Sequence, residues 1–406
     1  MSVSIIVPES LCWIGFLWLT YVYIGYPLCL LALQLRRKVR PVIAESYLPK
    51  VSVVIAARNE ENDIGCKLTG TLTWDYPPDK LEVLVASDAS DDRTDDIIRS
   101  IRDPRLIFQR MESRCGKNLA LNRLISNASG ELLFFTDANS QIEAGCLRRI
   151  VRHFADERVG CVTGEMKYVT EDADPAMSAG ERAYWGYESL VKRLESNIGS
   201  VLVCVGSVFC CRRALFTPVQ PEVANDMEIP IRIGDGGHYV CYEPSARSIE
   251  KTSATPWEEY VRRKRICAQG ILGMWKLREK LRGLRRWQFV SRKLLRWLAL
   301  VPMGMLFVAA LVLVSHTFFR ALVILQLAGY GAALVGFAFS MRGRTGGRIF
   351  SVPFYIVLLN VAALAGLVEA CRGKRFAVWE ITRGVKEIKP AAEKTLYTQC
   401  ESGELR

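Results

Sequence analysis

Histidine is scarce in this sequence: the 406 residues include three, at positions 153, 238 and 316. So few histidines leave little material for a Ser-His-Asp triad or for a metal site built from several histidines. A glycine-rich phosphate loop is also missing after the first segment that we expect to be a strand, residues 51–57. This absence disfavours a nucleotidyltransferase, which would combine such a loop with a similar α/β sheet.

Paired cysteine motifs are missing as well, although cysteine itself is frequent. The thirteen cysteines show no CxxC spacing and no Cys/His arrangement typical of a zinc site. Most of them lie in the part of the chain that we place in the cytoplasm, where thiols stay reduced. We therefore interpret them as small apolar residues.

Long uncharged apolar runs distinguish this chain from a soluble enzyme. Hydrophobic residues make up 50% of the sequence, and the mean hydropathy is positive, at +0.13. Each of four runs has about the 20 residues that a helix needs to cross a bilayer core. The first run has no basic stretch before it and no small-residue cleavage pattern, so we do not expect a cleaved signal peptide. The sequence predicts an integral membrane protein rather than a soluble domain with buried helices, with runs at 11–33, 297–319, 321–341 and 349–368.

The net charge of +12 comes from one segment. Residues 262–296 contain thirteen lysines or arginines and a single acid, Glu279. Apolar residues recur there at loosely helical spacing, and the segment leads directly into the second apolar run. A basic amphipathic stretch of this kind is expected to lie on anionic lipid. We therefore predict membrane contact and no nucleic-acid binding.

Basic residues also follow the first run, in LRRKVR at 35–40. The positive-inside rule then places the N-terminus outside and the region between the first two runs in the cytoplasm, at an inner or plasma membrane. The loop MRGRTGGR at 341–348 also has a cytoplasmic composition, but four spans would place the basic C-terminal tail outside. One run can therefore be re-entrant or interfacial, and Pro353 favours the last run.

Apolar segments with polar ends indicate the fold between the membrane runs. Residues 51–57 and 81–86 are near-continuous apolar stretches, as strands covered on both faces should be, and ELLFFTDANS at 131–140 repeats the pattern. Helix-like segments separate them, which predicts an α/β fold with a mostly parallel sheet. Ligands bind at the carboxyl edge of such sheets, where the polar ends meet. The expected organisation is a membrane helix at 1–36, the α/β domain at 48–255, basic interfacial helices at 256–296, membrane helices at 297–370 and a basic tail at 371–406.

Polar residues after these strands are candidates for binding a nucleotide and its phosphates. Asp88 follows the second strand and could accept hydrogen bonds from a base or a ribose, or cap the next helix. Asn59 and Glu60 after the first strand have the same two interpretations. Lys117 is a suitable cation for a phosphate.

The stretch FFTDANS at 134–140 is a buried strand that ends in polar groups. Asp137 and Asn139 present a carboxylate and an amide oxygen with one residue between them. Such a pair suits a metal ion bound to a phosphate, although an ordinary strand with a polar turn behind it has the same pattern.

Residues that could act on an acceptor follow further along the chain. Gly206 and Ser207 lie in an apolar strand, where a glycine often marks a close backbone approach or a bulge. Asp226 precedes a short amphipathic segment, either as a helix cap or as a general base for an acceptor hydroxyl. The cluster RRKR at 262–265 could clamp a diphosphate or snorkel to a membrane surface.

Taken in order, seven motifs resemble those of the inverting family 2 glycosyltransferases, on the branch that contains membrane-embedded polysaccharide synthases. They are VIAARNEE, SDASDDRT, GKNLALN, FFTDANS, VGSVFCCRR, ANDMEIPIRI and RRKRI. The resemblance covers residues 51–269 and extends to VWEITR at 378–383 in the tail. It implies a GT-A fold that binds a nucleotide sugar, with a UDP-sugar as the expected donor and a divalent cation, Mg²⁺ or Mn²⁺.

The resemblance also implies roles for individual residues. Asp88 corresponds to the aspartate that contacts the uridine, and Asp137 to the first residue of the metal-binding DxD motif. Asp226 corresponds to the catalytic base, and Arg262 and Arg265 to the Q/RxxRW motif near the diphosphate and the acceptor. The expected site comprises Ala57, Asn59, Glu60, Asp88, Lys117, Asp137, Arg262 and Arg265 for the donor, Gly206 and Ser207 on the acceptor side, and Asp137 and Asn139 for the metal.

Two positions depart from the family pattern. Asn139 stands where DxD has its second carboxylate, which implies a weaker hold on the metal. Ile266 stands where the RxxRW motif has a tryptophan that helps to form the acceptor site in polymerising relatives. Processive synthesis is therefore not implied.

The predicted function is transfer of a sugar with inversion to a membrane-associated acceptor, in surface or exopolysaccharide synthesis. The acceptor is either a growing glycan or a lipid-linked sugar, and other polysaccharide-assembly proteins are candidate partners. A rival from another class is a non-catalytic membrane scaffold that keeps the fold. That rival predicts a damaged set of acids, whereas Asp88, Asp137 and Asp226 are all present.

Overall fold

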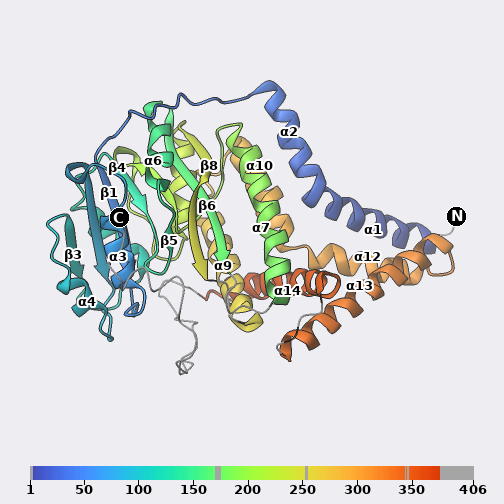
Figure 1. Cartoon of the computed structure of the whole chain (residues 1–406). Helices are drawn as coiled ribbons and strands as arrows, with labels where there is room; N and C mark the ends of the chain where they lie inside the picture. Colours follow the sequence, from blue (N-terminus) through green and yellow to red (C-terminus); the bar gives the residue numbers. More distant parts are fainter. Residues whose placement is uncertain (1–2, 170–174, 252–254, 343, 345–346, 375–406) are drawn as a thin grey trace.

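The computed structural model describes residues 3–169, 175–251, 255–342, 344 and 347–374, and it joins an α/β domain to a group of long apolar helices (Figure 1). The predicted fold class is confirmed, because eight strands form one mixed sheet with helices on its faces. The strands are β1 (Val51–Ala57), β2 (Leu81–Ser87), β3 (Leu106–Arg110), β4 (Leu132–Phe135), β5 (Gln141–Ile142), β6 (Val159–Val169), β7 (Phe209–Arg212) and β8 (Tyr239–Lys251).

The strand order in the sheet is β3-β2-β1-β4-β7-β6-β8-β5. The pairs β1–β2, β2–β3, β1–β4 and β6–β8 are parallel, whereas β7 runs antiparallel to both of its neighbours and β5 runs antiparallel to β8. Every residue of β1, β2 and β4 is buried, which explains their near-continuous apolar sequences. Because Ala57 pairs with Ser87, the polar segments that follow β1 and β2 lie side by side.

Two apolar clusters cover the two faces of the sheet. Residues of α3 (Ile64–Leu72), α4 (Thr94–Ser100) and α6 (Cys146–Val151) pack on one face. Residues of α5 (Lys117–Ile125) and α8 (Asn225–Asp235) pack on the other. The remaining helices near the sheet are α7 (Pro175–Ser196), α9 (Pro256–Lys276) and α10 (Gly283–Phe289), with 3₁₀ turns at Pro78–Lys80, Arg152–Ala155 and Arg213–Leu215.

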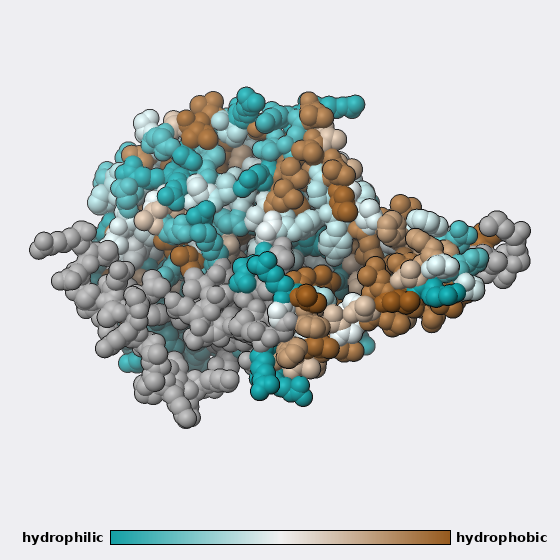
Figure 2. Space-filling view, turned by 45° about the vertical axis from the view of Figure 1, so that its right-hand side comes forward, coloured by the Kyte–Doolittle hydropathy of each residue, from teal (hydrophilic) through white to brown (hydrophobic). Residues whose placement is uncertain are grey.

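Apolar helices project from this domain, and hydrophobic residues gather on them in the space-filling view (Figures 1 and 2). Within the described residues, three helices are long and apolar enough to cross a membrane. The first, Ile6–Arg36, combines α1 (Val3–Thr20), a π-helical turn (Tyr21–Gly25) and α2 (Tyr26–Arg36). The other two are α13 (Thr317–Met341) and α14 (Gly347–Cys371).

The second predicted run, 297–319, is not one straight helix. A helix over Gly283–Trp297 and α12 (Leu300–Val312) meet at an angle of 56°. The first of these contains α10, a π-helical segment (Val290–Leu294, here η5) and α11 (Leu295–Trp297). Pro302 in the first turn of α12 cannot donate a backbone hydrogen bond, so a new helix begins there instead of the old one continuing. Together, the two halves can form a fourth span.

The apolar helices pack in two different ways. Residues of α1, α12 and α13 share a cluster that includes Cys12, Leu306 and Phe319. Helix α14 lies against both α9 and α13: a Cβ on Gly366 would be 2.4 Å from the carbonyl oxygen of Lys264, and a Cβ on Gly336 of α13 would be 2.3 Å from that of Phe350. The tail prediction, including VWEITR, falls on residues outside those that the structure describes.

Candidate active site

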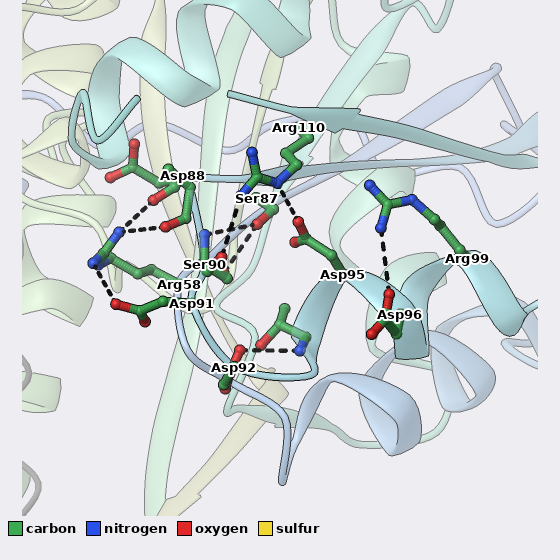
Figure 3. Close-up of polar contacts among 12 residues, drawn as sticks. Arg58, Ser87, Asp88, Ser90, Asp91, Asp92, Asp95, Asp96, Arg99 and Arg110 are labelled. Carbon is green, nitrogen blue, oxygen red and sulfur yellow. Dashed lines mark hydrogen bonds and ion pairs between the residues drawn. The ribbon is translucent and has the colours of Figure 1, made fainter. Parts of the chain in front are cut away.

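The ends of β1 and β2 form the first part of the site. Ala57 closes β1, and its carbonyl oxygen accepts a hydrogen bond of 2.9 Å from the backbone N–H of Asp88. Asn59 and Ala89 both have a φ of 52°, a left-handed conformation that costs energy and is concentrated at functional sites. Arg58 holds the second of these turns, because Nη1 donates to the carbonyl oxygens of Asp88 at 2.7 Å and Ala89 at 2.8 Å (Figure 3).

The segment that follows β1 is tied to the one that follows β2. The side-chain oxygen of Asn59 accepts a hydrogen bond of 3.1 Å from the backbone N–H of Asp91, and the backbone N–H of Asn59 donates to Ser90 Oγ at 3.2 Å. The backbone N–H of Glu60 donates to Thr94 Oγ1 at 2.8 Å. Two of the predicted donor-site residues, Asn59 and Glu60, therefore lie in one cross-linked loop pair.

Asp88 is fully buried and does not cap a helix that follows β2, since α4 starts at Thr94. Its Oδ1 accepts from the backbone N–H of Cys115 at 2.7 Å, and its Oδ2 from that of Gly116 at 2.9 Å. These bonds fix the start of α5 and so the position of Lys117. An ionised carboxylate has about four acceptor sites, so Asp88 can still accept a bond from a bound base.

Lys117 and Asp137 form an ion pair between the start of α5 and the segment after β4. Burial would raise the pKa of Asp137, but Lys117, Lys67 and Arg265 outweigh it and hold the pKa below its ordinary value. The Asp137 carboxylate thus lies among basic side chains from α5, α3 and α9. Basic groups in this arrangement suit a diphosphate.

Lys67 was missed by the sequence analysis. It is 7% exposed, and its ammonium donates to Thr136 Oγ1 and to the Ser140 carbonyl, both at 2.7 Å, and to Ser140 Oγ at 3.3 Å. It thereby holds both ends of the loop that carries Asp137 and Asn139. Burial lowers its pKa to about 7, although the charge of Asp137 opposes this. A signal was available, because Lys67 interrupts the apolar face of α3 formed by Ile64, Leu68 and Thr71.

Glu250 is a second residue that the sequence analysis missed. The antiparallel register, which pairs Gln141 with Ile249, carries Glu250 alongside the Asp137 loop. Burial raises its pKa, and the charge of Asp137 adds to the effect, whereas a hydrogen bond from Ser207 opposes it. Ser207 also bonds Ser248 at 2.8 Å, and residues two apart on a strand share a face. Only the three-dimensional register of β8 brings Glu250 to the site.

Asp226 lies in the first turn of α8, but Ala224 is the N-cap residue, so Asp226 is not a helix cap. Gly206 and Ser207 were predicted to lie in a strand, but they lie in a turn before β7, which starts at Phe209. The Oδ2 of Asp226 would be 3.5 Å from a Cβ placed on Gly206, so the absence of a side chain at Gly206 keeps the space beside the carboxylate open. Burial raises the pKa of Asp226; Lys117 and Lys293 lower it, and Asp137 raises it further. In the described part of the chain, no ion pair or donor from another residue engages its carboxylate.

The two predicted arginines lie on α9 and reach the site through their charges. Arg265 lowers the pKa of Asp137, and Arg262 acts in the same direction on Glu250. Arg262 also pairs with Glu259 at 2.6 Å. Arg263 has a different role: it is buried, pairs with Glu259 at 2.7 Å and lies 4.2 Å from the ring of Tyr184, so it does not snorkel toward a membrane.

The residues around Asp137 fit a divalent cation only in part. No group of three His, Cys, Asp or Glu side chains able to hold a metal occurs among the described residues. Mg²⁺, however, is commonly bound by one or two carboxylates together with waters and substrate phosphates. Asp137, the amide of Asn139 and the nearby carboxyl of Glu250 can supply such a partial set, which a diphosphate would complete.

Parallel strands that end in acidic residues, basic side chains near them and an unpaired carboxylate are the features expected of a GT-A type of sheet domain. The fold is similar to the solved structure of mannosyltransferase PcManGT from Pyrobaculum calidifontis, in complex with GDP-Man and Mn²⁺. The TM-score is 0.68 at 22% sequence identity, and the match covers 90% of this chain and 100% of that chain. This likeness shows the fold.

Residues 52–217 match the family model described as Glycosyl transferase family 2, and the chain carries a glycosyltransferase domain of that family. A relative from Bacillus subtilis (strain 168), the probable glycosyltransferase YdaM, is 26% identical over 238 residues, 55% of each chain. The beta-monoglucosyldiacylglycerol synthase of Synechocystis sp. (strain ATCC 27184 / PCC 6803 / Kazusa) is 28% identical over 238 residues, 54% of this chain and 49% of that protein. The chain thus spans about half the length of these curated relatives.

Proposed function

We propose that this chain is a membrane-embedded inverting glycosyltransferase. It would move a sugar from a nucleotide sugar, expected to be a UDP-sugar, to a glycan or lipid-linked acceptor in surface or exopolysaccharide synthesis. The observation that carries the proposal is the position of Asp226, a half-buried carboxylate whose charge interacts with Asp137 and Lys117 and that has Gly206 beside it. A non-catalytic scaffold would have no need for an unpaired, desolvated carboxylate at this place.

The proposed reaction is a single displacement at the anomeric carbon. Asp226 takes the proton of the acceptor hydroxyl while the oxygen attacks the face opposite the diphosphate, so the configuration inverts. General-base assistance of this kind contributes about 10²–10⁴-fold to the rate. The nucleoside diphosphate leaves with its electron pair, and Lys117, Arg262 and Arg265 supply the positive charge that stabilises it. The raised pKa of Asp226 makes it a stronger base than an ordinary aspartate.

Asp137 and Asn139, with Glu250, are the residues that would hold a divalent cation. When bound, the cation would add positive charge at the diphosphate and so favour its departure. The nearby Lys67 and Lys117 keep Asp137 ionised, which is the form that binds a metal.

The packing of the helices supports a particular membrane orientation. α1, the bent pair and α13 would cross the bilayer, and α14 would lie at the cytoplasmic surface along α9. Tyr355 of α14 bonds Glu259 at 2.8 Å, and Glu369 near its end pairs with Lys264 at 3.1 Å, so α14 follows a helix of the catalytic domain. Three crossings from an outside N-terminus would end inside, and the α/β domain, the loop at 342–346 and the tail would then lie in the cytoplasm.

The direct test of the function uses membranes that contain the full chain, incubated with a panel of labelled nucleotide sugars. Release of nucleotide from one donor, with label transferred to lipid or glycan, is the expected result. Parallel samples with a chelator test the cation, and restoration of turnover by Mg²⁺ or Mn²⁺ is expected. No release from any donor, in membranes whose chain is folded, would contradict the proposal.

A further inference from the structure

A buried cluster of charges joins the catalytic domain to the membrane helices. Arg292 of η5 pairs with Glu188 of α7 at 2.7 Å and also with Glu195. Arg296 pairs with Glu188 at 2.5 Å, and Tyr26 of the first membrane helix donates to Glu195 at 2.6 Å. These two arginines and two glutamates balance each other in charge and leave no net charge of their own.

Two lysines in the same cluster form no ion pair with a carboxylate among the described residues. Lys192 is 3% exposed, and its ammonium has no hydrogen-bond acceptor within the part of the chain that the structure describes. It lies 5.3 Å from the ring of Trp185 and 5.6 Å from that of Tyr242. The charge of Glu165 acts on Lys192, but the two form no ion pair, and Glu165 accepts a hydrogen bond from Ser189 at 2.5 Å. Burial without an acceptor disfavours the charged ammonium and lowers the pKa of Lys192, and an anion bound beside it would favour the charged form again.

Lys293 is the second unpaired cation, and it lies toward the catalytic base. Its charge acts on Asp226 from η5, while that of Lys117 acts from α5. It is four residues from Phe289 and four from Trp297, and both of these pack in one apolar cluster with Met227, the residue after Asp226. Among the described residues, no carboxylate lies within ion-pair distance of the Lys293 ammonium. Because η5 belongs to the first half of the bent membrane pair, Lys293 lies on the segment that connects the catalytic domain to the membrane helices.

The cluster therefore has four basic side chains, Arg292, Arg296, Lys192 and Lys293, and at most three carboxylates, Glu165, Glu188 and Glu195. An excess positive charge beside the base, on the membrane side, fits an anion that arrives from the membrane. We infer that Lys293 and Lys192 bind a phosphate group of a lipid acceptor and so present its hydroxyl or sugar to Asp226. This inference rests on the proposed function and narrows the acceptor to a phosphate-bearing lipid.

A neutral acceptor lipid would leave both ammonium groups unpaired even in the complex. A phosphate, in contrast, has oxygens enough for charge-assisted bonds to both lysines, and these bonds are the strong ones in a site of low dielectric. A lipid headgroup and free phosphate share this chemistry, so the experiment has to separate the two sources.

The test uses the full chain purified in detergent and measures binding of three probes by calorimetry and by the shift in melting temperature. The probes are dioctanoyl phosphatidic acid, dioctanoylglycerol and inorganic phosphate. The expected result is that phosphatidic acid binds and raises the melting temperature, and that dioctanoylglycerol does not. Inorganic phosphate that binds as tightly as phosphatidic acid would overturn the assignment to a lipid.

Variants locate the site. Lys293→Gln and Lys192→Gln should each weaken binding of phosphatidic acid by about tenfold or more, the usual value of a hydrogen bond to a charged group. Arg286→Gln, which removes an exposed charge from α10 on the same segment, should leave it unchanged. Neither lysine has an ionic partner to lose, so the melting temperature of the ligand-free variants should not fall. Undiminished binding in both lysine variants would overturn the inference.

Turnover of nucleotide sugars separates this inference from the proposed function. A chain that releases nucleotide and transfers sugar, but does not bind phosphatidic acid, would refute the lipid-phosphate site and leave the transferase intact. A chain that binds phosphatidic acid through Lys293, but turns over no nucleotide sugar, would refute the proposed function instead.

Discussion

The ammonium group of Lys67 lies 2.7 Å from the carbonyl oxygen of Ser140 and 2.7 Å from Thr136 Oγ1. Helix α3 therefore holds both ends of the loop that presents Asp137. A lysine is buried here at a cost in desolvation, and the bonds that it donates replace those it would make with water. The position of the candidate metal and diphosphate ligand thus depends on a residue from a different part of the chain.

Lys67→Met should damage the donor site without removing any group that contacts the donor. The change leaves the Ser140 carbonyl without its donor, which costs about 1–3 kcal/mol in the free energy of unfolding, partly offset by burial of the apolar side chain, whereas Thr136 Oγ1 keeps its bond with Ser140 Oγ. The freed loop should bind nucleotide sugar more weakly, as measured by calorimetry. Lys80→Met, which removes an exposed lysine, is the matched control. Wild-type donor affinity in Lys67→Met would show that the loop does not need this anchor.

The pH dependence of transfer should report Asp226. The base works in its ionised form, so the rate falls as the pH drops through a pKa that burial has raised above the ordinary value of about 3.9. Lys293→Gln removes a positive charge that favours ionisation of Asp226, so it should move the acid limb of the pH–rate profile to higher pH. Arg286→Gln should not move it. A limb that is insensitive to Lys293→Gln would show that another group controls the profile.

The same pKa shift has a consequence for stability. The folded state binds a proton at Asp226 more tightly than the unfolded state does, so ionisation of this group above its raised pKa costs stability. Asp226→Asn removes that cost and should leave the free energy of unfolding at pH 7 equal or higher. Chemical denaturation of the two proteins at pH 7 tests this, and a clear loss of stability would contradict the account of a desolvated, unpaired carboxylate.

Glu250→Gln should weaken the binding of a divalent cation. The Glu250 carboxyl lies near Asp137 and can supply the second carboxylate ligand that the amide at Asn139 does not provide. Electron paramagnetic resonance of Mn²⁺ with the full chain and nucleotide diphosphate measures affinity without requiring turnover. Glu131→Gln, at an exposed carboxylate of the same domain, provides the control. Equal Mn²⁺ affinity in wild type and Glu250→Gln would remove Glu250 from the metal site.

The orientation of the chain can be tested with epitope tags in intact and permeabilised cells. A tag in the turn before α13, near His316, should be accessible in intact cells, because that turn and the N-terminal part of α1 belong to one end of the bundle. A tag after residue 374 should be accessible only after permeabilisation. Exposure of the second tag in intact cells would show that α14 crosses the bilayer.

The sequence was sufficient to predict the fold class and the convergence of the strand ends, because apolar strands buried on both faces have an unmistakable pattern. Ala57, Asn59 and Asp88 meet at one edge through the in-register pairing of β1 and β2. The roles of these residues stay predictions. The bend at 298–299 was not predicted, since mean hydropathy does not distinguish a straight helix from two halves.

Two residues of the site were beyond sequence reasoning for different reasons. Glu250 reaches Asp137 only through the register of β5 on β8, which joins segments about a hundred residues apart. Lys67 was discoverable in principle as a charge on an apolar helix face, but its acceptors, Thr136 and Ser140, lie on another element. The positions of Glu250 and Lys67 in the site depend on contacts between distant segments, which the local sequence pattern does not show.

The most direct measurement compares nucleotide release and sugar transfer by the wild-type chain and by Asp226→Asn, with the donor that the panel identifies. Asp235→Asn, at the far end of the same helix, is the control. The account predicts that Asp226→Asn loses about 100-fold or more of the transfer rate, as expected for a general base, while donor affinity stays at the wild-type value. Transfer by Asp226→Asn at close to the wild-type rate would contradict it.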